Sequence, residues 1–329
     1  MPCYVRQLIV CTKWRMAKYQ SDSNTAPTFS VIIPVHNDWA PLVACLESLA
    51  NQVNPSNFEV IVVDDGSSEE APESIRNWSN SYPLTIITQP RAGVSAARNR
   101  GIRVCNGSFL LFIDADSRLH NDSLAVLSSK ITESPNDSCF QLHLIGDRKT
   151  LVGKAEDIRL ETIQQHTLLA DGRIRYLNTA GFAIRRSRVD LERGLFDAAA
   201  LRGEDTLLLA DMLRGGELPV FVGQAFVRHA IGLSPIQCVI KEIRSALLES
   251  ATYNRIHAME VRIRASHAAR IKMLLWMWGF SRQSSIGRSA WALAVARQLV
   301  RRIASTAATH LHLGPRKTLD EKHDSTPMG

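Results

Sequence analysis

The 329-residue sequence lacks a long apolar run; its longest apolar patches are 271–280 and 290–296. Neither patch approaches the roughly 20 consecutive apolar residues that a membrane-spanning helix needs. Near the N-terminus, the run Leu8–Cys11 is also too short for the core of a secretory signal peptide. The sequence therefore predicts a cytoplasmic protein without a membrane-spanning helix.

Paired cysteines are missing as well. The sequence has six cysteines, with no C-x-x-C pair and no histidine at zinc-ligand spacing. This argues against a zinc site and indicates reduced thiols, which are typical of a cytosolic protein. The six are Cys3, Cys11, Cys45, Cys105, Cys139 and Cys238.

Two common nucleotide-binding loops are also absent. The segment RAGVSAARNRGI (91–102) matches neither G-x-G-x-x-G nor G-x-x-x-x-G-K-[ST], which argues against a dehydrogenase and a P-loop enzyme. Arg91 nevertheless precedes a helix expected to open near Val94, where a diphosphate can be met. Arg98 and Asn99 lie inside that helix. A solvated basic face is the alternative interpretation.

Acidic residues are scarce in only one part of the chain. Between Arg255 and Arg302 there are ten basic residues and one acid, Glu260, a net charge of +9. Because the whole chain carries +7, the remainder carries about −2, and the basic character belongs to the C-terminal region alone.

From Phe29 onward, short β-branched runs alternate with helical patterns, which predicts an α/β fold. We expect a doubly wound, mostly parallel but mixed sheet with helices on both faces. Ligands of such sheets bind beyond the carboxyl ends of the strands, so the acids that follow the strands are expected to converge. The four strands expected first are 29–35, 58–64, 84–88 and 109–114.

After about residue 230 the pattern is helical only, beginning with an amphipathic segment over 236–247. Met16 is a second candidate start, because the stretch that follows it is polar. The expected organisation is a disordered leader (1–28), a catalytic domain (29–230), a basic amphipathic helical region (231–313) and a disordered tail (314–329).

The most informative motif is Asp114-Ala115-Asp116 at the end of an apolar strand. Two carboxylates at i and i+2 can approach one divalent cation that is held mainly by phosphate oxygens, which suits Mg²⁺ or Mn²⁺. A solvated turn or a helix cap is the alternative.

The strand VIVVDDGSS (60–68) ends in acids that can accept hydrogen bonds from a nucleobase or a ribose, with Gly66 relaxing the turn. An Asx turn that caps the next helix is the alternative. Glu204 and Asp205 begin a helix, where acids are ordinarily explained by the helix dipole and otherwise provide a catalytic base. His229 closes an apparent strand, and such a histidine is more often structural than a ligand.

Six segments in this order resemble the family 2 glycosyltransferases of GT-A fold, over roughly 29–229. They are SVIIPVHND, VIVVDDGSS, RAGVSAARNRGI, FLLFIDADS, NTAGFAIRRS (178–187) and GLFDAAALRGEDTLLLADMLRGG (194–216). The resemblance implies transfer of a sugar from a nucleotide-diphosphate donor, with UDP-sugars the commonest donors, in cell-surface polysaccharide or glycolipid synthesis. Ser117 and Arg118 stand where many relatives carry a further acid, which implies a weaker metal site or a different loop.

The resemblance also implies roles for individual residues. Asp116 would be the direct ligand of Mn²⁺ or Mg²⁺, and His229 would supply a further ligand. Asp205, with Glu204 beside it, would be the general base that takes the proton of the acceptor hydroxyl in a single, inverting displacement. Donor binding would fall to Pro34, His36, Asn37, Asp65, Arg98, Asn99, Asp114 and Ala115.

The basic region has two interpretations. Aromatic residues such as Trp276, Trp278 and Trp291 lie among its arginines, so the region 255–302 suits an anionic membrane surface that carries a lipid-linked acceptor, at the inner face of the plasma membrane. Alternatively, it is a helical subdomain packed on the catalytic domain. We expect no nucleic-acid partner, because the catalytic domain is slightly acidic and shows no nucleic-acid motif.

Two other functions stay open. A nucleotidyltransferase uses a similar sheet and paired acids but gives no reason for the Gly-Glu-Asp helix start. A non-catalytic binding or scaffold subunit would not need Asp114, Asp116 and Asp205. The sequence does not identify the donor sugar, the acceptor, whether glycan or lipid-linked, or the oligomeric state.

Overall fold

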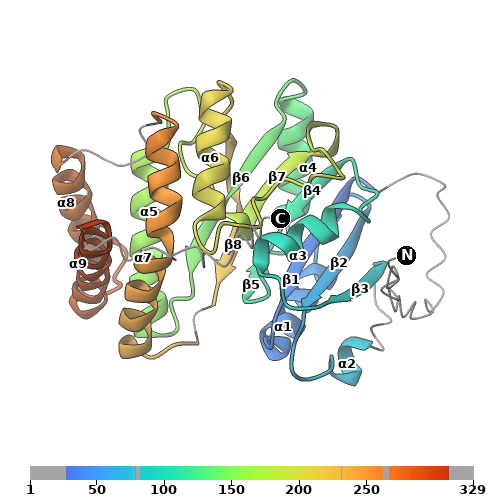
Figure 1. The fold of residues 1–329 in the computed structure, drawn as a ribbon, viewed down its shortest axis with the longest axis horizontal. Helices are drawn as coiled ribbons and strands as arrows, with labels where there is room; N and C mark the ends of the chain where they lie inside the picture. Colours follow the sequence, from blue (N-terminus) through green and yellow to red (C-terminus); the bar gives the residue numbers. More distant parts are fainter. Residues whose placement is uncertain (1–26, 77, 79–81, 231, 262–266, 311–329) are drawn as a thin grey trace, which may run out of the picture.

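The computed structural model describes residues 27–310 except 77, 79–81, 231 and 262–266 (Figure 1). The predicted tail and almost all of the predicted leader lie outside these residues and stay predictions. The strands are β1 (Phe29–Val35), β2 (Phe58–Asp65), β3 (Leu84–Gln89), β4 (Phe109–Phe112), β5 (Ser117–Leu119), β6 (Cys139–Gly146), β7 (Phe182–Arg185) and β8 (Val220–His229). The helices are α1 (Trp39–Ala50), α2 (Glu73–Arg76), α3 (Val94–Ile102), α4 (Ser123–Glu133), α5 (Leu151–Thr167), α6 (Glu204–Arg214), α7 (Pro235–Ala258), α8 (His267–Gln283) and α9 (Arg288–His310).

The strands form one eight-stranded mixed sheet in the order β3-β2-β1-β4-β7-β6-β8-β5. The four strands predicted first, β1 to β4, are parallel to one another and occupy one half of the sheet. The other half is mainly antiparallel, because β7 runs against both β4 and β6, and β5 runs against β8. The predicted α/β fold with a mixed sheet is therefore confirmed, and its parallel part is the half nearest the N-terminus.

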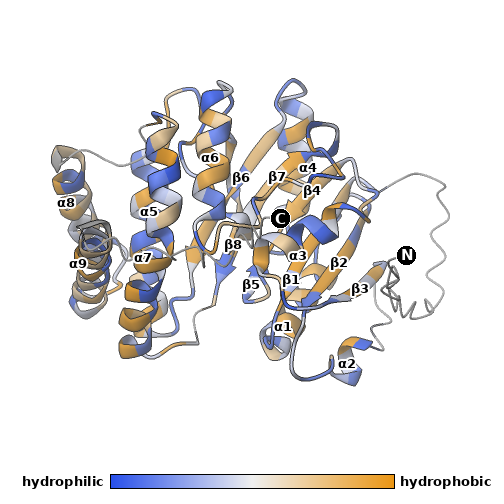
Figure 2. Ribbon diagram, in the orientation of Figure 1, coloured by the Kyte–Doolittle hydropathy of each residue, from blue (hydrophilic) through white to orange (hydrophobic). Residues whose placement is uncertain are grey.

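The inner parallel strands β1 and β4 are largely apolar and buried, because helices cover both faces of the sheet there. Along β1, Val31 and Ile33 belong to one core cluster together with Leu42 of α1. The residue between them, Ile32, belongs to a second cluster together with Ala97 of α3. Figure 2 shows the apolar colouring of these strands between the helices.

The C-terminal helices pack on the rest of the molecule. In Figure 1, α8 and α9 lie at one end, with α5 and α7 between them and the sheet. Met277 of α8 and Ala294 of α9 share a core cluster with Ile158 of α5, and all three side chains are fully or almost fully buried. None of the helices in the described part of the chain is long and apolar enough to cross a membrane.

The structure differs from the expected elements in three places. The fourth strand ends at Phe112, two residues early, because the chain turns there and the Ser117 N–H donates to the Asp114 carbonyl at 3.0 Å. Only Phe182–Arg185 of the expected strand 178–187 is extended, because the Asn178 side chain caps a short 3₁₀ turn before it. The helix α5 occupies a stretch for which the sequence predicted no element.

Candidate active site

The loops that follow β1, β2 and β3 are hydrogen-bonded to one another at the carboxyl edge of the sheet. The Asp65 carboxylate accepts the N–H groups of Ala92 and Gly93, both at 2.8 Å, and the amide of Gln89 at 2.8 Å. Asp65 is 5% exposed. It therefore fixes the start of α3 against the end of β2.

The turn after β1 completes this framework. The Nδ1 atom of His36 lies 3.0 Å from the Asp65 carbonyl oxygen. Asn37 adopts a φ of 59°, and its side-chain oxygen accepts the Ser68 N–H at 2.8 Å. Gly66 has a φ of +70°, and a Cβ there would lie 2.7 Å from the Arg91 backbone nitrogen, so this close approach requires glycine.

Pro34 and Ala115 are connected with the site by where they lie in the backbone. Pro34 is half-buried within β1, in register with Val63 of β2. Ala115 is 6% exposed and its side chain belongs to the hydrophobic core, while its backbone lies between the two acids of the D-x-D turn. Their predicted contacts with a donor stay predictions.

Arg98 joins two segments that are far apart in the sequence. Its guanidinium group donates to Asp114 Oδ1 at 2.8 Å and to Glu204 Oε1 at 2.8 Å. Burial by itself would lower the pKa of Arg98, but the two carboxylates outweigh burial and raise it. Because the Arg98 side chain is 3% exposed, it ties the D-x-D turn firmly to the start of α6.

Asn99 plays a different part from its neighbour. Its side-chain oxygen accepts the N–H groups of Leu195 and Phe196, both at 3.0 Å, and its amide donates to the Phe196 carbonyl at 2.6 Å. With these bonds its side chain holds the chain segment that leads to α6. The role that the resemblance gives it, support of the loop around the donor, remains a prediction.

Asp116 and His229 meet because β5 pairs with β8. The antiparallel register places Ser117 opposite His229, and the Nε2 atom of His229 lies 3.0 Å from Asp116 Oδ2. Burial would raise the pKa of Asp116, but His229 and Lys241 together lower it. Burial also disfavours the charged form of His229, and Asp116 and Glu156 overcome this, so the pKa of His229 is raised.

The Asp116 carboxylate and the neighbouring His229 imidazole suit a divalent cation as ligands. Its second oxygen, Oδ1, is buried and has no hydrogen-bond partner, which leaves a lone pair for a ligand. Carboxylate and imidazole are both ordinary ligands of Mn²⁺. Among the described residues there is no group of three or more His, Cys, Asp or Glu side chains able to hold a metal ion.

The acids at the edge of the sheet influence one another. Burial and the nearby charge of Asp116 raise the pKa of Asp38, which follows β1. At the start of α6, burial and the adjacent Glu204 raise the pKa of Asp205 to about 7. Of the acids that follow the strands, Asp38 therefore lies near Asp116 as expected, and Arg98 joins Asp114 to Glu204, which begins α6.

The C-terminal region reaches this site. The Thr252 hydroxyl of α7 donates to the Arg202 carbonyl at 2.7 Å, just before α6. Behind His229, Glu156 of α5 lies in ion-pair contact with it and with Arg297 of α9. Sequence analysis missed Glu156, because the sequence shows it only as one acidic residue within a helical stretch. A cavity of about 420 Å³ is lined only by residues of α7, α8 and α9 and lies apart from these acids.

The fold is that of the GT-A glycosyltransferases. Two solved structures illustrate this, S. aureus TarS 1-349 in complex with UDP and the mannosyltransferase PcManGT from Pyrobaculum calidifontis in complex with GDP-Man and Mn²⁺. The first superposes with a TM-score of 0.51 at 17% identity, covering 87% of this chain and 91% of the other. The second has a TM-score of 0.54 at 17% identity, covering 88% and 86%.

Residues 30–193 match the family model described as Glycosyl transferase family 2, and the chain belongs to this family over that segment. It is 34% identical over 115 residues to an uncharacterised glycosyltransferase, YibD, of Escherichia coli K12, a match covering 35% of this chain and 33% of that protein. It is 39% identical over 119 residues to a PGL/p-HBAD biosynthesis glycosyltransferase of Mycobacterium bovis, covering 35% and 46%. The matched segments thus span less than half of these relatives.

Proposed function

We propose that this chain is an active glycosyltransferase that moves a sugar from a nucleoside-diphosphate donor to an acceptor hydroxyl. The observation that carries the proposal is the buried bridge from Asp114 through Arg98 to Glu204. Because Asp205 directly follows Glu204, the bridge makes the D-x-D turn and the candidate base parts of one site. A binding or scaffold subunit would have no use for this coupling.

The donor would lie on the loops at the carboxyl edge of the sheet. His36, Asn37 and Asp65 would meet the nucleotide base, since their loops are already tied together by hydrogen bonds. Asp114 would face the ribose, and Arg98 would hold Asp114 in place. UDP is the first nucleotide to test, and GDP is the second, because the two solved relatives contain UDP and GDP-Man.

Asp205 would act as the general base. It accepts the proton of the acceptor hydroxyl as the acceptor oxygen bonds to the anomeric carbon, while the bond from that carbon to the diphosphate oxygen breaks. A pKa of about 7 suits this exchange, because a base works best when its pKa is near the working pH. One such displacement inverts the anomeric configuration and gives a β-linked product from an α-linked donor.

Asp116 and His229 would hold a divalent cation, Mn²⁺ or Mg²⁺, together with oxygens of the donor diphosphate. When bound, this ion would neutralise the charge that develops on the departing nucleoside diphosphate. The unpartnered Asp116 Oδ1 supports the assignment.

Thermal unfolding with nucleoside diphosphates tests the donor site. UDP, GDP, ADP and CDP are added to the wild type with and without Mn²⁺, and to Asp116→Ala under the same conditions. We expect one nucleotide to stabilise the wild type only with Mn²⁺, by about 2.7 kcal/mol at a hundredfold excess over its Kd. Asp116→Ala should abolish this stabilisation.

The matched control is Asp211→Ala, which removes an exposed carboxylate from α6 and should keep the full effect. If no nucleotide stabilises the wild type with or without Mn²⁺, the scaffold alternative gains the advantage. Product analysis separates the other alternative, since a sugar transferase releases nucleoside diphosphate and a nucleotidyltransferase releases pyrophosphate.

For the acceptor we propose a glycan or a lipid-linked saccharide, in synthesis of a polysaccharide or other glycoconjugate at the cytoplasmic face of the plasma membrane. The C-terminal helices support a membrane-surface partner. Ile271 and Leu275 are 61% and 68% exposed on one face of α8, and Leu299 and Ile303 are 50% and 69% exposed on one face of α9. Basic residues such as Lys272 and Arg302 stand next to them in the sequence, a combination that suits anionic lipid.

Vesicle flotation tests this partner with the full chain. We expect binding to vesicles of mixed phosphatidylcholine and phosphatidylserine that weakens strongly in the double variant Leu275→Glu, Ile303→Glu. The control variant Val53→Glu adds a charge at another exposed apolar residue, 52% exposed, outside the C-terminal helices. Equal flotation of all three proteins would exclude this surface as a membrane contact.

A further inference from the structure

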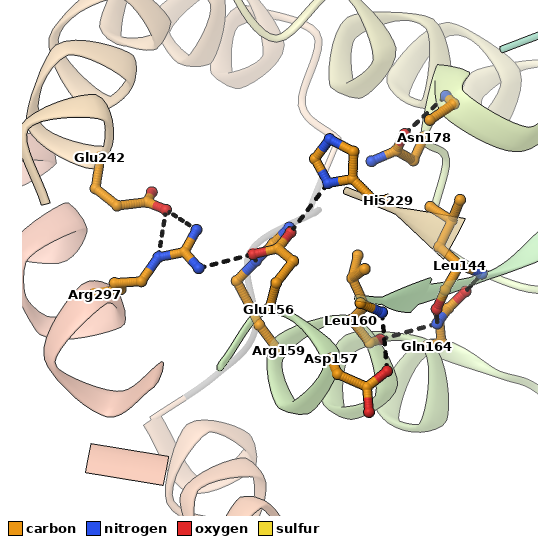
Figure 3. A network of polar contacts seen from close by, with 12 residues as sticks. Leu144, Glu156, Asp157, Arg159, Leu160, Gln164, Asn178, His229, Glu242 and Arg297 are labelled. Atoms are coloured by element: carbon orange, nitrogen blue, oxygen red, sulfur yellow. Dashed lines mark hydrogen bonds and ion pairs between the residues drawn. The ribbon is translucent and has the colours of Figure 1, made fainter. Parts of the chain in front are cut away.

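A chain of buried charges lies behind His229, on the side away from Asp116 (Figure 3). The Nε2 atom of His229 is 3.0 Å from Asp116 Oδ2, and its Nδ1 atom is 3.9 Å from Glu156 Oε1. Each ring nitrogen therefore faces a carboxylate. The imidazole ring lies between the D-x-D turn and the helix α5.

Glu156 is itself held from two sides. It is 2% exposed, and its carboxylate accepts hydrogen bonds from Arg159, one turn further along α5. On the other side, Arg297 Nη1 lies 2.9 Å from Glu156 Oε2. That contact is an ion pair, whereas the Arg297 guanidinium donates hydrogen bonds to Glu242 Oε1 of α7, at 3.1 Å and 2.6 Å.

The network continues away from the site. Arg301, one turn beyond Arg297 on α9, pairs with Glu242 and with Glu249 of α7. It makes no contact with Glu156. The basic C-terminal helix thus reaches the candidate metal ligand through Arg297 and not through Arg301.

Stability alone gives little reason for such a network. Burying paired charges is expensive, and well-packed apolar residues are often as stabilising or more so. A histidine that ligates a metal, in contrast, regularly presents its second nitrogen to a carboxylate, which sets the tautomer and the ring orientation. Glu156 lies on that side of His229, with Oε1 at an ion-pair distance of 3.9 Å from Nδ1.

We propose that Glu156 and Arg297 are positioning residues for metal binding. Glu156 orients the His229 ring so that Nε2 faces the cation beside Asp116, and Arg297 of α9 keeps Glu156 in place. The inference rests on the proposed function, because it assumes a cation at Asp116 and His229. It assigns part of the C-terminal helical region a role in the active site.

Binding of Mn²⁺ in the presence of UDP or GDP tests the inference, with the bound fraction read from the electron paramagnetic resonance signal of free Mn²⁺. The full chain is used throughout. Glu156→Gln removes the carboxylate charge with little change of shape, and Arg297→Met removes the guanidinium group. We expect both variants to bind Mn²⁺ about 10–100-fold more weakly than the wild type.

Arg301→Met is the matched control. It removes an arginine from the same helix and the same network and should keep wild-type Mn²⁺ affinity. Because the Arg301 side chain is 38% exposed, against 6% for Arg297, this variant should lose less stability in urea denaturation than Arg297→Met. If Arg297→Met does not fold, Arg297→Lys replaces it. Lysine retains the positive charge but lacks the planar guanidinium group that reaches both Glu156 and Glu242. We expect its Mn²⁺ affinity to lie between that of the wild type and that of Glu156→Gln. Wild-type Mn²⁺ affinity in folded Glu156→Gln and Arg297→Lys would overturn the inference.

Two further variants separate this inference from the proposed function. Asp116→Ala and His229→Ala should each abolish Mn²⁺ binding if the metal site is correct. If these two variants bind Mn²⁺ like the wild type, the metal assignment itself is wrong. If they fail to bind Mn²⁺ while Glu156→Gln and Arg297→Met bind it normally, only the positioning role is wrong.

Discussion

Glu204 and Asp205 are neighbours in the chain, yet their surroundings differ. Glu204 Oε1 lies 2.8 Å from Arg98 and its charge is compensated. For Asp205, burial and the charge of Glu204 together raise the pKa to about 7, while the Thr206 N–H bond at 2.6 Å opposes the shift. The environments assign separate roles, because Glu204 is engaged in an ion pair with Arg98 while Asp205 can exchange a proton near neutral pH.

This difference predicts a pH-dependent stability. The pKa of Asp205 in the folded protein lies above its unfolded value, so its contribution is fully present below about pH 4 and is lost as the pH rises through about 7. In Asp205→Asn there is no carboxyl group at this position to titrate, so this pH-dependent loss of stability is absent. Its unfolding free energy relative to the wild type should therefore increase between pH 4 and pH 7 and stay constant above, as measured by urea denaturation.

Asp211→Asn, on the exposed face of the same helix, should show no such trend. A difference between Asp205→Asn and wild type that does not change with pH would contradict the raised pKa. In activity measurements, Asp205→Asn should turn over about 10²–10⁴-fold more slowly, the usual contribution of a general base.

At the scale of elements, α3 organises the site from the N-terminal half of the chain. Its start is held by Asp65, and its buried side chains reach the D-x-D turn through Arg98 and the segment before α6 through Asn99. The segment before α6 also needs Gly194, which has a φ of +82° and lies against Asn99. A Cβ at Gly194 would be 2.4 Å from the Asn99 side chain.

Gly194→Ala should therefore be costly for two reasons. A left-handed backbone conformation costs an alanine about 1–2 kcal/mol, and Asn99 must also give up hydrogen bonds worth about 1 kcal/mol each. Gly172→Ala is the matched control, since Gly172 has a φ of +81° but no atom within 4 Å of the added Cβ. Urea denaturation should show a larger loss for Gly194→Ala; equal losses would mean that the Asn99 contact is unimportant.

Strand register brings together the two candidate metal ligands in the same way. His229 meets Asp116 because β8 pairs with β5, with His229 opposite Ser117. A shift by one residue would turn the His229 side chain to the other face of the sheet. The buried core of both strands, including Leu119 and Val227, prevents that shift.

At the scale of the whole molecule, the C-terminal helices belong to the same packed structure as the sheet. They share a core with α5 and a buried charge network with α5 and α7. Arg297 and Arg301 are engaged in that network, and Arg255 pairs with Asp197, so part of the basic charge serves packing. This packing agrees with the second interpretation of the basic region, a packed helical subdomain, while Arg262 and Arg264 lie outside the described residues.

This packing predicts cooperative unfolding. Met277→Ala removes a fully buried side chain of α8 and should destabilise the protein by about 2–5 kcal/mol. The whole chain should still unfold in one transition, seen alike by fluorescence and by far-ultraviolet circular dichroism. Leu275→Ala, at a 68% exposed position on the same helix, should change stability by less than about 0.5 kcal/mol. Separate transitions would mean that the C-terminal helices form an independent unit.

Much of the parallel half of the sheet was predictable. The expected strands at 29–35, 58–64 and 84–88 agree with β1, β2 and β3 to within one residue at each end. Short continuous apolar runs predict buried parallel strands well, because helices cover both faces of such strands and remove their side chains from water. The helix α5 was missed since its buried face includes Glu156, Asp157 and Gln164, which interrupt the apolar period.

The sequence by itself determined the parallel strands and the edge at which Asp65, Asp114 and Asp116 gather, because these depend on local apolar pattern and on the direction of the strands. Only the tertiary structure decided which partner each charge meets. Arg98 and Glu204 are 106 residues apart, and Glu156 meets Arg297 only once α9 packs on α5. Such pairs follow from how the elements pack, and a local pattern of residues does not specify which distant side chains will meet.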